Sequence, residues 1–322
     1  MIMGIRSSLC KLRCAFWRHP PAPPGSFFPC IAMNKDHCFQ KGTAMSTQYL
    51  HVTDGIIAFD DQGQGPLVLC MPAGGDLRSE YRYLTPQLIA AGYRVVTMDM
   101  RGQGESSVDW PEYTDAALGS DMLALIKHLG SSPAFLIGAS KAAGAALQAS
   151  LQEPSLVRGL VLIGPFVAAP RSALLTKLTV FLLLAPPWGV ALFSSYFPRM
   201  YPKARPADFE EHRRRVKAML REPGRLHALR QLFSESSGAT YTRHGEVQAP
   251  TLILMGSRDP DFKDPEQEAR TLAGRLPHAA VQIIEGAGHH LQVEEPEVVG
   301  QSILAFLQTC DKPEAASLRE VE

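Results

Sequence analysis

Short apolar runs recur along the chain and alternate with longer stretches in which apolar and polar residues are mixed. Apolar runs of this length, bounded by turn residues, are typical of buried strands. Six of them are predicted as strands: residues 67–71, 95–99, 135–137, 156–163, 251–256 and 281–284. Residues 48–60 instead alternate well enough for antiparallel strands, with a hairpin turn at Asp54-Gly55.

Helices are predicted between several of these runs. Tyr81–Ala91 has amphipathic spacing, and Thr114–Leu129 begins at an N-cap near Thr114 and is closed by Gly130. A further helix is predicted from the small residues that follow Ser140. Strands that alternate with helices in this way predict an α/β fold around a mostly parallel sheet.

Ser140 lies at the junction between a predicted strand and a predicted helix. Gly138 and Ala142 flank it, two residues to either side. A strand that turns into a helix within so few residues strains the middle residue and brings the flanking positions together, so both must be small. This is the G-x-S-x-G pattern of a nucleophile elbow, with Ala in the last place. Small residues would also let a helix pack closely on a sheet, which is the alternative interpretation.

The last two predicted strands each end near a residue that a serine nucleophile needs. The first of them leads to Asp259, with Asp261 close by, and the second leads to His289-His290. A serine requires a base, and the base requires an orienting acid. Because the carboxyl ends of parallel strands meet at one edge of a sheet, Ser140, an acid and a histidine are expected to share one site.

A fourth motif, Asp99–Ser106, resembles the D-x-R-G-x-G-x-S turn of the α/β-hydrolase superfamily. The nucleophile elbow and the order serine, acid, histidine are also typical of that superfamily. Residues 48–308 therefore resemble an α/β-hydrolase. The resemblance implies an α/β-hydrolase fold, with a mostly parallel central sheet, helices on both faces and a helical cap insertion. It also implies that Ser140 attacks a carbonyl carbon, His289 accepts its proton and Asp259 orients the imidazole.

The superfamily pattern also selects between the neighbouring candidates. Its acid falls three residues after a glycine that corresponds to Gly256, which favours Asp259 over Asp261. Its histidine directly follows a glycine, as His289 follows Gly288, which favours His289 as the base. An apolar residue usually comes next, where this chain has His290. His290 is then expected to line the pocket or to pack beneath it.

The oxyanion hole is expected at the end of the strand at 67–71. Superfamily members usually carry His-Gly there, followed by the residue that donates a backbone N–H, whereas this chain has Pro72-Ala73. The donor is therefore predicted to be Gly74, and a register shift of one residue would move the role to a neighbour. The second predicted donor is the backbone N–H of Lys141. The Lys141 side chain either lies along the first helical turn or acts on the serine or on a carboxylate-bearing substrate.

Strand–helix alternation stops between residues 168 and 247, where the resemblance implies the cap. Leu178–Pro198 contains no charged residue, and Asp208–Arg230 is highly charged. A run of this length raises the question of a membrane span, but Pro186-Pro187 would break such a helix. We therefore expect two short helices that line an apolar pocket, and transient docking of this stretch to lipid is the less favoured alternative.

Composition limits the remaining possibilities. Lys plus Arg and Asp plus Glu are balanced at 32 each, so no net field favours nucleic acid. The six cysteines show neither zinc spacing nor a disulfide framework, which fits a cytoplasmic location. Residues 1–44 are basic, rich in proline and acid-poor, and are expected to be either an organellar leader or sequence before a true start at Met45. The expected core is residues 45–167 and 248–310, followed by a tail at 311–322.

These features predict a serine hydrolase that cleaves carboxylic esters of small to medium apolar substrates. A carbon–carbon bond hydrolase, a thioesterase or a perhydrolase would use the same three residues, and a ligand-sensing receptor with slow turnover is the alternative of another class. No metal and no cofactor are expected. The partner is a small molecule, and the protein is expected to be a monomer or homodimer.

Overall fold

The computed structural model describes residues 47–167, 173–235 and 238–311. The predicted leader and residues 312–322 of the predicted tail lie outside the described residues, so the predictions for them stay untested.

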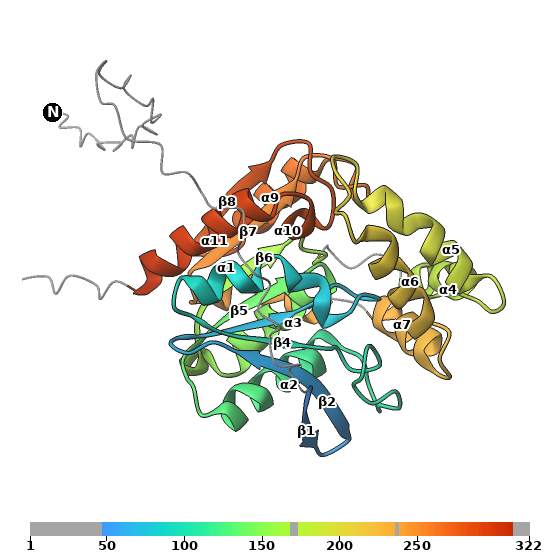
Figure 1. The fold of residues 1–322 in the computed structure, drawn as a ribbon, viewed down its shortest axis with the longest axis horizontal. Coiled ribbons are helices and arrows are strands. Elements are labelled where there is room, and N and C mark those ends of the chain that lie inside the picture. The colour runs from blue at the N-terminus through green and yellow to red at the C-terminus, as the bar shows by residue number, and fades with distance from the viewer. Residues whose placement is uncertain (1–46, 168–172, 236–237, 312–322) are drawn as a thin grey trace, which may run out of the picture. The chain divides into compact units, whose positions relative to one another are not determined.

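One sheet of eight strands forms the centre of the fold (Figure 1), in the order β1-β2-β4-β3-β5-β6-β7-β8. β1 pairs antiparallel with β2, and β2 pairs antiparallel with β4, whereas all the remaining neighbours are parallel. The strands are β1 Gln48–Val52, β2 Gly55–Gln62, β3 Leu67–Met71, β4 Arg94–Met98, β5 Ala134–Ala139, β6 Val157–Ile163, β7 Thr251–Gly256 and β8 Ala279–Ile284. The predicted strands and the predicted hairpin are confirmed.

Helices cover both faces of this sheet. The apolar residues of α2, α3 and α9 pack with strand residues such as Leu69, Leu136 and Ile253 on one face. Those of α1 and α11 pack with the alternate residues, such as Val68 and Ile137, on the other face. The alternation arises because successive side chains of a strand point to opposite faces. These helices are α1 Thr85–Ala90, α2 Asp115–Leu129, α3 Lys141–Gln152, α9 Pro265–Ala273 and α11 Pro296–Asp311.

The helix ends follow the local sequence, with one correction. Thr114 caps α2 by accepting a hydrogen bond from the Ala117 N–H at 3.1 Å. The prediction of one helix over Tyr81–Ala91 is wrong in its first half, because a 3-10 helix (η1, Arg78–Arg82) precedes α1. Pro86 explains the break, since proline fits in the first turn of a helix but not in its interior.

A helical insert separates β6 from β7. It contains α4 Ala173–Leu183, α5 Gly189–Tyr196, the 3-10 helix η3 Phe197–Met200, α6 Phe209–Met219, α7 Arg225–Ser234, α8 Gly238–Thr242 and η4 His244–Glu246. Shorter elements elsewhere are η2 Pro154–Leu156 and α10 Leu291–Glu294. The insert has its own apolar cluster around Phe197 and Phe209, which reaches the rest of the fold through Leu77 and Val293.

The uncharged stretch of the insert is divided as expected at the proline pair. α4 ends at Leu183 and α5 begins at Gly189, on either side of Pro186-Pro187. Among the described residues, no helix is long and apolar enough to cross a membrane.

Candidate active site

Ser140 occupies the turn between β5 and α3. Its φ of 50° and ψ of −113° make it the one non-glycine residue with positive φ in the described part of the chain. A Cβ on Gly138 would lie 2.3 Å from the carbonyl oxygen of Ala142, so this position tolerates no side chain. Strained backbone of this kind is held by its surroundings, and here the Ser140 N–H donates to the Ile163 carbonyl at 2.8 Å. The geometry is that of a nucleophile elbow.

His289 and Asp259 lie in the loops that follow β8 and β7, and they are in direct contact. Nδ1 of His289 is 2.7 Å from Oδ2 of Asp259, and both side chains are buried. Burial alone would lower the pKa of His289, but the charge and hydrogen bond of Asp259, helped by Asp261, raise it to about 9. The site therefore stabilises the imidazolium that forms when a histidine accepts a proton.

Asp261 is close to the same imidazole but is held differently. One of its oxygens is 3.6 Å from His289 Nδ1, and its carboxylate accepts a hydrogen bond from the Tyr196 hydroxyl at 2.6 Å. Its backbone N–H donates to Oδ1 of Asp259 at 3.0 Å. Asp259 is thus the carboxylate in hydrogen-bond contact with the imidazole, and Asp261 supports it.

Ser140 and His289 line one pocket of about 490 Å³. Apart from a few polar groups, its lining is apolar. Most of the apolar side chains belong to the insert: Val180, Leu183, Leu184, Leu192, Phe193, Phe197 and Phe233. A small number of convergent polar groups in an apolar pocket is the usual form of a small-molecule site. Of the other predicted site residues, Gly74, Lys141 and Asp261 also line it.

The backbone N–H groups of the two predicted donors, Gly74 and Lys141, have no acceptor among the described residues. The neighbouring Ala73 N–H is excluded as an oxyanion donor, because it donates to Oε2 of Glu80 at 2.7 Å. Gly75 is the alternative one residue further on, since its N–H is also without an acceptor in this part of the structure. The geometry is compatible with an oxyanion hole formed by Gly74 and Lys141.

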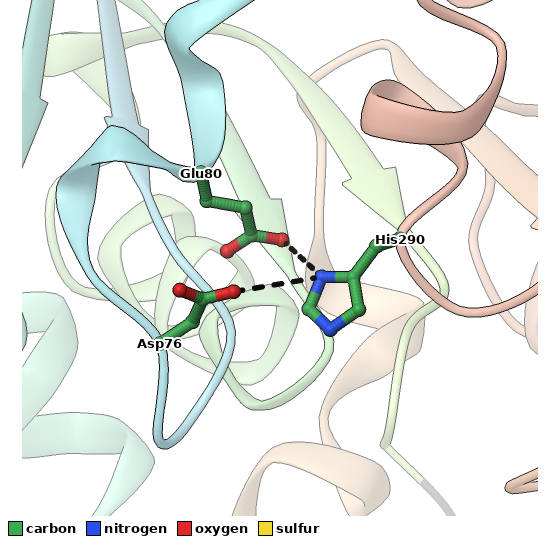
Figure 2. Close-up of side chains that lie close together, drawn as sticks. All are labelled: Asp76, Glu80 and His290. Carbon is green, nitrogen blue, oxygen red and sulfur yellow. Dashed lines mark hydrogen bonds and ion pairs between the residues drawn. The ribbon is translucent and has the colours of Figure 1, made fainter. Parts of the chain in front are cut away.

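Asp76, Glu80 and His290 form a buried polar cluster (Figure 2). Asp76 and His290 also line the pocket. Oε1 of Glu80 lies 2.9 Å from Nδ1 of His290, and Oδ2 of Asp76 lies 3.8 Å from the same nitrogen. Because the other Glu80 oxygen accepts the Ala73 N–H, Glu80 connects His290 to the loop that carries Gly74. His290 lines the pocket, as one of the two alternatives from the sequence had it.

His212 of α6 connects the insert to this cluster. Its Nε2 is 2.7 Å from Oδ1 of Asp76, and both side chains are buried. Burial opposes charge on both groups, but the attraction between them outweighs it. The pKa of Asp76 is accordingly lowered and that of His212 is raised.

In the described part of the chain, two groups of side chains have ligand atoms close enough together to hold a cation. They are Asp76, Glu80 and His290, and Asp259, Asp261 and His289, with the atoms of each group within 4.8 Å of one another. In each group the imidazole nitrogen is already at hydrogen-bond distance from a carboxylate. We assign no metal to either group, and the expectation of a metal-free enzyme stays a prediction.

The Lys141 side chain neither follows the helix surface to water nor reaches the serine. Its Nζ is 2.7 Å from Oδ1 of Asp115, and both side chains are almost fully buried. Gly144 makes room for this pair, since a Cβ there would lie 2.5 Å from the Asp115 carboxylate. Thr240 of the insert donates to the same carboxylate at 3.2 Å. The positive charge of Lys141 is therefore paired with Asp115 inside the fold.

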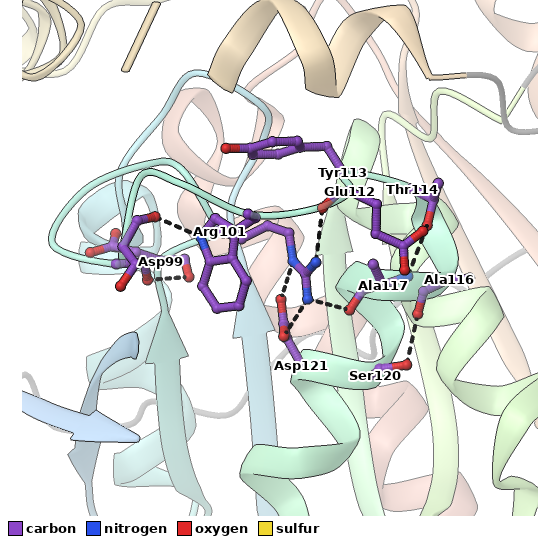
Figure 3. A network of polar contacts seen from close by, with 12 residues as sticks. Asp99, Arg101, Glu112, Tyr113, Thr114, Ala116, Ala117, Ser120 and Asp121 are labelled. Carbon is purple, nitrogen blue, oxygen red and sulfur yellow. Dashed lines mark hydrogen bonds and ion pairs between the residues drawn. The ribbon is translucent and has the colours of Figure 1, made fainter. Parts of the chain in front are cut away.

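The Asp99–Ser106 turn is a structural support beside the site (Figure 3). Arg101 makes two hydrogen bonds of 2.8 Å to Asp121 and stacks over Trp110, 4.4 Å from the ring centroid. A Cβ on Gly104 would lie 2.1 Å from the Asp99 carboxyl carbon, so the turn requires glycine there. These residues fix the loop after β4 and lie outside the pocket.

Comparison with known proteins places the chain in a family. Residues 66–296 match the family described as alpha/beta hydrolase fold, so the chain belongs to the α/β-hydrolase family. It is an enzyme of the hydrolase class, and the predicted fold is confirmed.

The chain is similar to individual members at modest identity. It is 30% identical over 266 residues to the dihydrolipoyllysine-residue acetyltransferase component of the acetoin cleaving system of Pseudomonas putida, covering 77% of this chain but 64% of that protein. It is 27% identical to 2-hydroxy-6-oxononadienedioate/2-hydroxy-6-oxononatrienedioate hydrolase 2 of the same species, covering 82% and 97%. Among solved structures, a thermophilic esterase from Thermogutta terrifontis has a TM-score of 0.67 at 22% identity, covering 82% of this chain and all of that one.

Proposed function

We propose that the protein is a serine hydrolase that cleaves carboxylic esters of small to medium apolar substrates. The observation that carries this proposal is the strained Ser140 at the same apolar pocket as a buried His289–Asp259 pair. Asp259 is proposed as the acid because it is the carboxylate in hydrogen-bond contact with the imidazole.

The proposed reaction has two halves. Ser140 Oγ attacks the ester carbonyl carbon while His289 takes the hydroxyl proton, and the N–H groups of Gly74 and Lys141 bind the oxyanion. Each such donor contributes roughly 3–4 kcal/mol in measured oxyanion holes. The imidazolium then gives its proton to the leaving alkoxide, and the acyl group remains on Ser140. Water, deprotonated by His289, releases the acid and restores the serine.

The insert is proposed to act as the cap that selects the acyl group. Its apolar side chains supply most of the pocket wall, and each methylene buried there favours binding by about 0.8 kcal/mol, roughly fourfold. Specificity is therefore expected to rise with acyl length over several carbons and to fall where the pocket ends.

Substitution of the proposed nucleophile and base tests the mechanism. Ser140→Ala and His289→Ala are each expected to abolish ester hydrolysis while the melting temperature stays near that of the wild type. Ser140→Ala activity within tenfold of the wild type would contradict the proposal.

Carbon–carbon bond hydrolysis is the second candidate, favoured by the similarity to the Pseudomonas putida hydrolase over nearly all of its length. Turnover of a vinylogous β-diketone acid by the wild type, with no turnover of any ester in a chain-length series, would select this alternative.

A further inference from the structure

Exposed apolar side chains concentrate on one part of the insert. Of the nine large apolar side chains that are well exposed in the described residues, six lie in α4, α5 and the segment between them, each 41–55% exposed. We call these six the α4–α5 patch: Leu178, Phe181, Leu182, Leu183, Trp188 and Leu192. Large exposed apolar side chains gathered in one segment are typical of an interaction site.

The patch is continuous with the pocket. Leu183 and Leu192 belong to both, since they line the pocket and are also 50% and 41% exposed. Val180 and Leu184, on the same stretch, line the pocket from the less exposed side. The patch therefore adjoins the pocket where Leu183 and Leu192 are exposed.

The insert that carries the patch has an excess of basic residues. Its residues 168–207 contain no Asp or Glu but five basic residues, Arg171, Lys177, Arg199, Lys203 and Arg205, of which Lys203 is paired with Glu295. Arg230 of α7 lies directly over Phe181, with its guanidinium carbon 4.2 Å from the ring centroid. Across residues 168–247 there are 13 basic and six acidic residues, although the whole chain is balanced.

This charge distinguishes between the possible occupants of the patch. A second copy of the chain would bring two positively charged inserts together. The leader of this chain carries five basic residues before its first acid at Asp36, so it is repelled as well. An anionic lipid surface attracts the basic residues and accepts the apolar ones.

We propose that the α4–α5 patch docks on anionic lipid membranes, with the mouth of the pocket against the acyl chains. An apolar substrate dissolved in the bilayer then enters the pocket without crossing water. The sequence alone leaves lipid docking as the less favoured alternative, because hydropathy does not show which residues of an uncharged stretch face outward. The helices lie at the surface, since none described spans the bilayer.

Vesicle sedimentation of the full chain tests this proposal without any substrate, so its result is independent of the proposed ester chemistry. The wild type is expected to sediment with vesicles of phosphatidylcholine and phosphatidylserine, and much less with phosphatidylcholine alone. Added salt should weaken the binding, since it screens the basic residues.

Two double variants provide the decisive comparison. Leu182→Ser with Trp188→Ser removes two patch residues that do not line the pocket, and is expected to lower vesicle binding at least tenfold. Tyr49→Ser with Val298→Ser removes two equally exposed apolar residues on β1 and α11, and is expected to leave binding unchanged. Both variants should retain the wild-type melting temperature.

Three outcomes would overturn the proposal. The first is no binding of the wild type to anionic vesicles, or equal loss in the two double variants. The second is a wild-type dimer that the patch variant alone dissociates, with no vesicle binding, which would make the patch a self-interface. The third is vesicle binding that appears only after deletion of residues 1–44, which would make the leader its occupant.

Discussion

Replacing Asp259 by Asn tests whether this carboxylate orients the imidazole of His289. In the structure one Asp259 oxygen accepts the Asp261 N–H at 3.0 Å, and the other lies 2.7 Å from His289 Nδ1. In the variant the amide oxygen must keep the Asp261 N–H, so the amide NH₂ faces Nδ1. That nitrogen can then only accept, which places the imidazole proton on Nε2, the atom that must take the serine proton.

The magnitude follows from two contributions. The pKa of His289 is raised from 6.5 to about 9, so its surroundings favour the imidazolium by about 3.4 kcal/mol, or roughly three-hundredfold. Asp259 is the largest favourable contributor, and the wrong tautomer adds to its loss. The same change lowers kcat about 10⁴-fold in a well-measured serine triad, and we expect a fall of that order here.

Asp261→Asn is the matched control. Asp261 lies 3.6 Å from the same nitrogen and is 24% exposed, so its loss is expected to lower kcat less than tenfold. The assay is kcat for a short chromogenic ester, with the melting temperature of each variant measured alongside. A greater loss from Asp261→Asn than from Asp259→Asn would show that the other carboxylate is the acid, and Asp259→Asn activity within tenfold of the wild type would refute the reasoning.

Three further predictions concern the base, the buried pair and the pocket. Because His289 must be neutral to accept a proton, kcat/KM is expected to rise with pH and to level off above an apparent pKa of about 9. Asp261→Asn should shift this rise in kcat/KM to lower pH. An unshifted pH profile would contradict the contribution of Asp261 to the pKa of His289. Lys141→Met leaves the Asp115 carboxylate buried without its ion-pair partner, so it should destabilise the fold by about 3–5 kcal/mol. Adding Asp115→Leu should restore much of the lost melting temperature. An unchanged melting temperature in the single variant would mean that the pair contributes nothing to stability. Leu183→Asp places a charge at a half-exposed residue that lines the pocket, so it should reduce hydrolysis of longer esters far more than of acetate esters. Equal losses of activity on both kinds of ester would show that Leu183 does not contact the acyl chain.

The parts of the site that the sequence predicts are those with local signals. Ser140 is marked by small residues two positions to either side, and Asp259 and His289 by their places just after apolar strands. Parallel strands bring such loops to one edge of the sheet regardless of their separation in the chain. The structure accordingly brings Asp259 into contact with His289 and places His289 and Ser140 at one pocket.

The parts that the sequence does not predict depend on pairs of distant residues. His212 and Asp76 are separated by 136 positions and meet only because the insert folds back over the loop after β3. No periodicity marks either residue, although His290 gave a signal by standing where an apolar residue is usual. Asp115, the partner of Lys141, likewise carries no local signal, because it is distant from Lys141 in the sequence.

The central claim is that Ser140 forms an acyl-enzyme, and covalent labelling tests it most directly. The wild type is treated with a fluorophosphonate, digested and mapped by mass spectrometry, beside the Ser140→Ala variant. The account predicts one stoichiometric adduct, on the peptide that contains Ser140, and none in the variant. An adduct on another residue, or no adduct on a wild-type sample that hydrolyses esters, would contradict it.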